Sequence, residues 1–76
     1  MAQASLSRQH FCRLAQATGA MWCEIHHIAG ENAALAIFDA MIDQLALACG
    51  EFNSGFKYSR FRDACYAAAK LPIPVE

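Results

Sequence analysis

Apolar side chains recur at helical spacing between Gly30 and Gly50, and they surround most of the circumference of that segment. The inner stripe, at steps of three and four residues, is formed by Leu35, Phe38, Ile42, Leu45 and Cys49. The apolar face is widened by Ile37, Met41 and Ala48. The polar edge is formed by Asp39, Asp43 and Gln44. The pattern predicts a buried helix over residues 33–49, with Asn32 as its N-cap. The first four residues of the inner stripe are expected to tolerate truncation least.

A second apolar stripe with the same alternation of steps precedes Gly30. It predicts one long helix over residues 8–29, with Ser7 as its N-cap and Gly30 as a left-handed stop. Glycine inside a helix costs roughly 1 kcal/mol relative to alanine, so Gly19 marks the weak point of this helix. The stripe keeps its phase across Gly19, which favours one helix over two. The short link at residues 31–32 then predicts that the first two helices pack antiparallel.

The next segment combines turn residues with Phe52 and Phe56, which predicts a loop that is pinned onto the core. A third helix is predicted over residues 59–71. Its inner stripe is formed by Phe61, Ala64, Cys65, Ala68 and Leu71. Pro72 ends this helix, and residues 72–76 are expected to form an extended tail.

Together these patterns predict an all-α fold, a small three-helix bundle with a long first helix, in a single domain over residues 1–76. Hydrophobic residues make up 57% of the 76 residues and 16 of them are alanines, so core material is ample for a chain of this size. This apolar composition is compatible with self-association or with a bound partner that covers apolar surface.

The charge of the chain is small in total but unevenly distributed. The net charge of −1 argues against nonspecific binding to nucleic acid or to an anionic membrane. Residues 31–51 carry four carboxylates and no Lys or Arg, whereas residues 52–71 carry four cations and one carboxylate. No apolar run reaches the roughly 18–20 residues that a membrane span needs, so we expect a cytoplasmic protein with no membrane span.

The cysteines are predicted to be reduced core residues, because they lie within helical patterns. They are Cys12, Cys23, Cys49 and Cys65. The nearest approach to a metal site is Cys23 with His26 and His27, which share one side of a helix. Cys12 would lie about 16 Å from Cys23 along that helix, so one ion cannot bind both. The spacing therefore predicts no metal site.

No group of residues indicates catalysis or a bound cofactor. The glycines are isolated, so there is no phosphate-binding loop. A cysteine nucleophile would need a cleft and an oxyanion site, and no cysteine lies at a predicted helix N-terminus, where a thiolate is favoured. The sequence therefore predicts a noncatalytic protein that needs no cofactor.

The candidate binding residues lie on the third helix and in the loop before it. They combine aromatic area with the hydrogen-bond donors of arginine, a mixture that anchors protein interfaces. The predicted partner-binding residues are Lys57, Tyr58, Arg60, Arg62 and Tyr66. Phe61 and one of Phe56 or Tyr58 are expected to pack in the core.

A small DNA-binding regulator is the alternative, because three short helices with a basic third one could mimic a helix-turn-helix module. The details favour a protein partner, since the first link is too short and the second too long. As a recognition helix, the third helix would also present alanines at positions where amides or arginines usually contact bases. These alanines are Ala64, Ala67, Ala68 and Ala69.

The run from Phe52 to Cys65 resembles the C-terminal signature of many small helical proteins encoded by bacteriophages and mobile elements. The matching positions are Asn53, Phe56, Arg60, Phe61, Ala64 and Cys65. The match covers about 14 of the 76 residues, and this chain departs from it at Ser54-Gly55 and after Tyr66. The resemblance implies a phage or plasmid accessory protein, a class that includes anti-CRISPR inhibitors. It implies a host multi-subunit complex as the partner, blocked sterically in the host cytoplasm.

Overall fold

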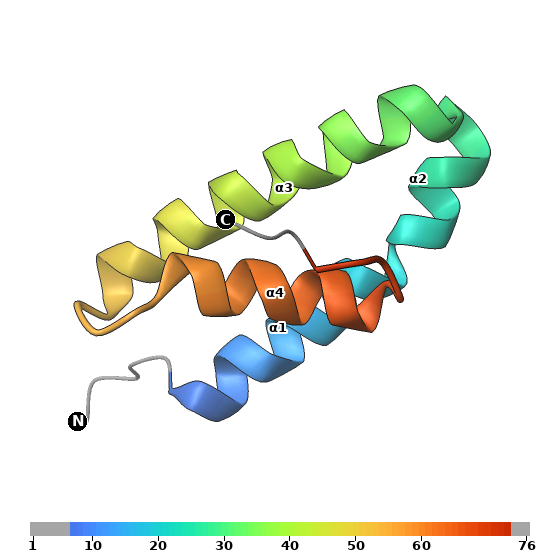
Figure 1. The fold of residues 1–76 in the computed structure, drawn as a ribbon. Coiled ribbons are helices and arrows are strands. Elements are labelled where there is room, and N and C mark those ends of the chain that lie inside the picture. Colours follow the sequence, from blue (N-terminus) through green and yellow to red (C-terminus); the bar gives the residue numbers. More distant parts are fainter. Residues whose placement is uncertain (1–6, 74–76) are drawn as a thin grey trace.

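The computed structural model describes residues 7–73, which contain four helices (Figure 1). They are α1 (Arg8–Ala20), α2 (Trp22–Ala29), α3 (Glu31–Phe52) and α4 (Tyr58–Ala68). No strand occurs within residues 7–73, and the predicted all-α fold class is confirmed. α4 packs against both α1 and α3, while α2 packs against α3. Figure 1 shows α4 between α1 and α3, with α2 closing one end of the molecule.

The single helix predicted over residues 8–29 is wrong, because the chain breaks into two helices at Met21. Met21 is a turn residue, and its N–H donates to the Thr18 carbonyl at 3.1 Å. The break turns α2 toward α3 and lets the ring of Trp22 pack on Phe38, with ring centroids 5.2 Å apart. Tertiary packing has thus overridden a continuous apolar stripe.

Gly30 alone links α2 to α3. Its φ of 84° is positive, as in the predicted left-handed stop, but its ψ of 163° is extended and differs from the left-handed helical value. This conformation is open to glycine and scarcely to any other residue. Its N–H donates to the His26 carbonyl at 3.0 Å, and its carbonyl accepts from the Ala34 N–H at 2.9 Å. The predicted link at residues 31–32 is wrong, because both residues lie in the first turn of α3.

The hydrophobic core consists of a narrow stripe of α3 and the side chains of α1 and α4 that face it. Its buried members are Ala15, Phe38, Ile42, Ala46, Phe61, Cys65 and Tyr66. Phe38 and Ile42 are fully buried, as the spacing predicted, and Leu45 is partly buried and packs against the core cluster. Leu35 is 43% exposed, so its predicted place in the core is wrong. Ala34, four residues before Phe38, satisfies the helical spacing equally well and is the buried residue instead.

Only two of the cysteines are core residues. Cys49 and Cys65 are buried, whereas Cys12 and Cys23 are exposed, so the prediction is wrong for the latter two. The reason is that α1 and α2 are each covered on one side, and these two thiols lie outside the covered side. All four cysteines are free thiols.

α4 ends at Ala68, three residues before the predicted end of the helix at position 71. Lys70 has a φ of 61°, and its N–H donates to the Ala67 carbonyl at 3.1 Å. The Leu71 N–H reaches back to the Tyr66 carbonyl at 2.9 Å. These two bonds form a Schellman motif, which ends the helix without a glycine. Of the predicted tail, residues 74–76 lie outside the described part of the chain.

α3 is long and apolar enough to cross a membrane, so the expectation that no segment reaches this length is wrong. The predicted helix stopped at position 49, whereas α3 continues to Phe52. Only 28% of its most apolar window is buried. The core helix of a soluble protein passes the same test, and the middle of α3 carries Asp39 and Asp43, which bind tyrosines of α4. Length and composition are therefore weak evidence for a span.

Candidate functional site

The predicted binding residues divide into two groups on opposite sides of α4. Arg60 and Arg62 are two positions apart, which separates them by about 200° around a helix of 3.6 residues per turn. Arg60 is exposed and lies with Lys57 on the side of α1. Arg62 is half-buried and lies with Tyr58 and Tyr66 on the side of α3. α4 therefore presents no single basic face.

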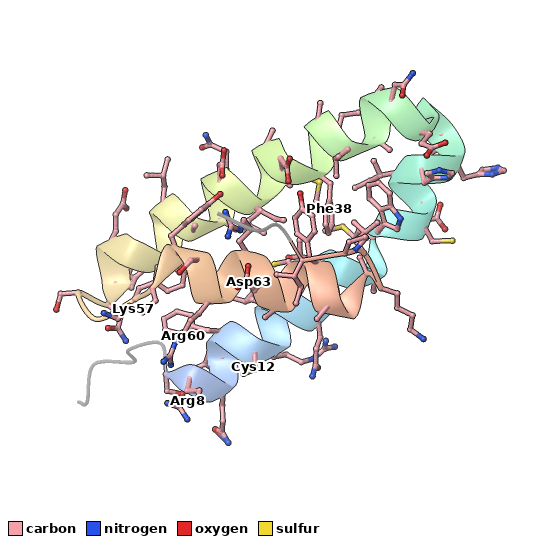
Figure 2. The ribbon with its side chains drawn as sticks, in the orientation of Figure 1. Arg8, Cys12, Phe38, Lys57, Arg60 and Asp63 are labelled. Atoms are coloured by element: carbon pink, nitrogen blue, oxygen red, sulfur yellow. The ribbon has the colours of Figure 1, made fainter. Side chains whose placement is uncertain are left out.

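A hollow of about 390 Å³ opens where α1 and α4 begin, and we call it the basic hollow. It is lined by Arg8, Phe11, Cys12, Asn53, Gly55, Phe56, Lys57, Arg60, Phe61 and Ala64. Figure 2 shows Arg8, Cys12, Lys57 and Arg60 gathered at this end of the molecule, far from Phe38 in the core. The hollow thus joins three segments: the first turns of α1, the loop before α4 and the first turns of α4.

The aromatic floor of the basic hollow is a row of three phenylalanines. The ring centroids of Phe11 and Phe56 are 4.9 Å apart, and those of Phe56 and Phe61 are 5.6 Å apart. Phe56 also packs against the core, which confirms that this loop is pinned by a phenylalanine. Phe52 is 64% exposed and takes no part, contrary to its predicted role.

The loop between α3 and α4 is held by a turn at Asn53. The Asn53 side-chain oxygen accepts from the Gly55 N–H at 2.8 Å, and its carbonyl accepts from the Phe56 N–H at 3.0 Å. The Lys57 carbonyl then accepts from the Phe61 N–H at 3.2 Å, which starts α4. This turn chemistry fixes Phe56 and Lys57 beside the first turn of α4.

Among the described residues, every charged side chain that lines the basic hollow is a cation. Arg8, Lys57 and Arg60 line it, no carboxylate does, and none of the three forms an ion pair within residues 7–73. α1 and α4 both begin here, so the positive ends of two helix dipoles add to the three cations. An anionic group next to an apolar side chain would match this combination of charge and aromatic floor.

Tyr58 and Tyr66, on the other side of α4, are occupied in joining α4 to α3. The Tyr58 hydroxyl donates to Asp43 Oδ1 at 2.6 Å, and the Tyr66 hydroxyl donates to Asp39 Oδ1. Tyr66 is 7% exposed, so its predicted place on an outward binding surface is wrong. The Tyr66 hydroxyl binds Asp39, which lies 27 residues earlier in the sequence, and this hydrogen bond holds the Tyr66 ring against α3.

Both tyrosines are stabilised in their neutral form. The hydrogen bond to Asp43, followed by burial, raises the pKa of Tyr58 to about 12. Burial, followed by the hydrogen bond to Asp39, raises the pKa of Tyr66 to about 12. The Arg62 guanidinium lies 5.8 Å from the centroid of the Tyr58 ring.

Other chemistry is sparse in the described part of the chain. Among residues 7–73, no group of three or more His, Cys, Asp or Glu side chains could hold a metal ion. Cys23, His26 and His27 are all exposed on α2. Burial raises the pKa of Cys49, and it raises the pKa of Cys65 to about 11, so both thiols remain protonated at neutral pH.

Sequence reasoning missed Arg8, Phe11 and Cys12, which form the α1 side of the basic hollow. Their distance along the chain from Lys57 and Arg60 hides the association. One signal was available: Arg8 lies in the first turn of a helix, where the helix dipole disfavours a cation, and no acidic residue is present there to offset it.

Comparisons of this protein with protein-family models, with curated proteins and with solved structures gave no match.

Proposed function

We propose that this protein is a noncatalytic binding module whose basic hollow receives an acidic segment of a partner protein. The observation that carries the proposal is the presence, around an aromatic floor, of three cations that form no ion pair with any residue from 7 to 73. A carboxylate of the partner would meet Arg8, Lys57 and Arg60, and a neighbouring apolar side chain would cover the phenylalanines. Such pairing of an apolar anchor with arginine is typical of the residues that dominate binding energy at interfaces.

The geometry favours a protein over a nucleic acid as the ligand. Duplex binding draws its affinity from many phosphate contacts, and the basic hollow offers three cations. The two arginines of α4 point to opposite sides, so this helix would bring only one of them to a groove. A DNA-binding regulator is the alternative function, and it predicts salt-dependent binding of duplex DNA.

The resemblance to small proteins of phages and mobile elements bears on the same site. The resembling run supplies seven of the ten residues that line the basic hollow, all of them between Asn53 and Ala64. On this proposal the partner belongs to a host complex, and the protein acts by steric occlusion of a surface. A small inhibitor of that kind needs no catalytic group, only a surface that binds.

The test uses a fluorescent peptide with one phenylalanine between pairs of glutamates, titrated with the full chain. Arg60→Glu should weaken binding by about tenfold or more, equivalent to about 1.4 kcal/mol. The variant should fold normally, because a glutamate near the start of a helix is favoured by the dipole. Arg13→Glu is the matched control, because Arg13 is an exposed arginine of α1 outside the basic hollow.

Three results separate the alternatives. Loss of peptide binding in Arg60→Glu but not in Arg13→Glu supports the proposal. Equal losses in both variants would mean that overall charge, and not the hollow, attracts the peptide. Tight binding of random duplex that falls steeply between about 50 and 200 mM salt would support the DNA-binding regulator instead.

A further inference from the structure

The outer side of α3 carries a second surface, unrelated to the basic hollow. Its central line, which we call the outer seam, is Ala33, Ile37, Ala40, Gln44 and Leu47. These residues follow one another at alternating steps of four and three and lie opposite the buried pair Phe38 and Ile42. All five are exposed, Ile37 by 43% and Leu47 by 64%.

The spacing of the outer seam is that of a coiled coil, in which one helix packs along another. Small side chains are interspersed with larger ones, since Ala33 precedes Ile37 and Ala40 separates Ile37 from Gln44 and Leu47. Two further exposed alanines, Ala36 and Ala48, flank the line. Alanines allow the backbone of a second helix to come close, so the shape fits a helix better than a loop or a strand.

Charge decides which helix would fit. Glu51 continues the line of the outer seam at its C-terminal end. Asp43 and Asp39 lie along the edge of α3 that faces α4, where each accepts a hydrogen bond from a tyrosine and keeps its negative charge. No Lys or Arg occurs in α3. A second copy of this chain would bring carboxylates against carboxylates, which costs free energy, whereas Lys and Arg side chains of another helix would be attracted.

We propose that the outer seam of α3 docks an amphipathic helix of another protein, one with an apolar line flanked by Lys and Arg. The docked helix would cover Ile37 and Leu47 and place its cations beside the carboxylates of α3. This inference does not depend on the basic hollow, which takes ligands of the opposite charge on the far side of α4.

The experiment uses a synthetic helical peptide with leucine and alanine along one line and lysines on both flanks, together with a second peptide that has glutamates on the flanks. The full chain should bind the lysine peptide at one site and the glutamate peptide at least about tenfold more weakly. Ala40→Glu should weaken binding of the lysine peptide by about tenfold or more, because a carboxylate would be buried in the seam. Glutamate is a good helix former at this exposed position, so the variant should keep its fold.

Ala17→Glu is the matched control, because Ala17 is exposed on α1 and the charge change is the same. If general attraction held the lysine peptide, both variants would bind it more tightly, and that result would overturn the proposal. A wild-type dimer that Ala40→Glu converts to a monomer would make a second copy the occupant and would also overturn it. The proposal would also be overturned if the wild-type chain bound neutral lipid vesicles and Ala40→Glu abolished this binding, because the outer seam would then be a membrane-binding surface.

Discussion

Gly19 of α1 lies directly against Ala68 of α4, so closely that a Cβ on Gly19 would overlap the Ala68 side chain. The same Cβ would come within 2.9 Å of the Ala68 carbonyl carbon and of the Ala69 nitrogen. Backbone atoms cannot move aside as the end of a flexible side chain can. The glycine that weakens α1 as an isolated helix is therefore what allows α1 and α4 to approach closely.

Gly19→Ala should destabilise the protein. Alanine is favoured over glycine inside a helix by about 1 kcal/mol, but the overlap with α4 costs about 1–3 kcal/mol or more. Urea unfolding followed by circular dichroism measures the net effect. Gly50→Ala is the control, since its Cβ would lie 4.0 Å from the nearest side-chain atom, at Phe56. This variant should gain up to about 1 kcal/mol, and a gain of the same size at Gly19 would contradict the packing described above.

Lys70→Gly should stabilise the protein by about 0.5–1 kcal/mol. Lys70 holds the left-handed position of the Schellman motif with a φ of 61°, a conformation that glycine adopts without a steric cost. Lys70→Ala keeps the unfavourable φ while removing the charge, so it should leave the melting temperature almost unchanged. Equal stabilisation by glycine and alanine would assign the effect to charge and not to backbone conformation.

Truncation of the core stripe should separate Phe38 from Leu35, which the spacing alone treats as equals. Phe38→Ala should cost about 3–5 kcal/mol, enough to unfold much of so small a protein. Leu35→Ala should cost less than about 1 kcal/mol, because Leu35 is 43% exposed. Thermal melts of the two variants give the comparison, and a large loss at Leu35 would mean that this side of α3 is covered in solution.

The stability of the protein should fall as the pH rises above about 9. An unfolded thiol loses its proton near pH 9.0 and an unfolded tyrosine near pH 10.0, whereas the folded-state pKa is about 11 for Cys65 and about 12 for Tyr58 and Tyr66. Between these values the folded chain holds more protons than the unfolded chain, so the free energy of unfolding decreases with increasing pH. Urea titrations at successive pH values measure this slope.

Tyr66→Phe isolates one of these groups. The variant should lose about 1–3 kcal/mol at neutral pH, because Asp39 loses a hydrogen-bond donor at a part-buried site. Its stability should also fall less steeply above pH 10, since phenylalanine has no proton to release. An alkaline slope identical to that of the wild type would show that Tyr66 titrates normally in the folded state.

Periodicity predicts correctly the features of this fold that depend on the sequence of a single helix. Phe38 and Ile42 are buried at the expected spacing, and Gly30 has the expected positive φ. The break at Met21 could not be read from α1 and α2, because it depends on where Trp22 packs on α3. The end of α4 was missed because Lys70 occupies a position that usually carries glycine.

Only the α4 side of the candidate site could be predicted from the sequence, because only that side is formed by one local segment. Lys57 and Arg60 stand close together in the sequence and line the basic hollow as part of one local segment. Phe11 reaches the same hollow only because α1 packs beside α4, a contact that no local pattern records. Tyr66 was assigned to the surface because its partner, Asp39, belongs to another helix.

The pairing of α1 with α4 also has a consequence for the order of folding. α2 and α3 are joined by one residue and can pair as soon as both helices form, since the loop to be closed is minimal. The contact of Gly19 with Ala68 closes a loop that spans most of the chain, so its entropic cost is met only after the intervening helices have formed. Substitutions at this contact should then act chiefly on the unfolding rate, which makes the junction between α1 and α4 the part of the molecule that sets its lifetime.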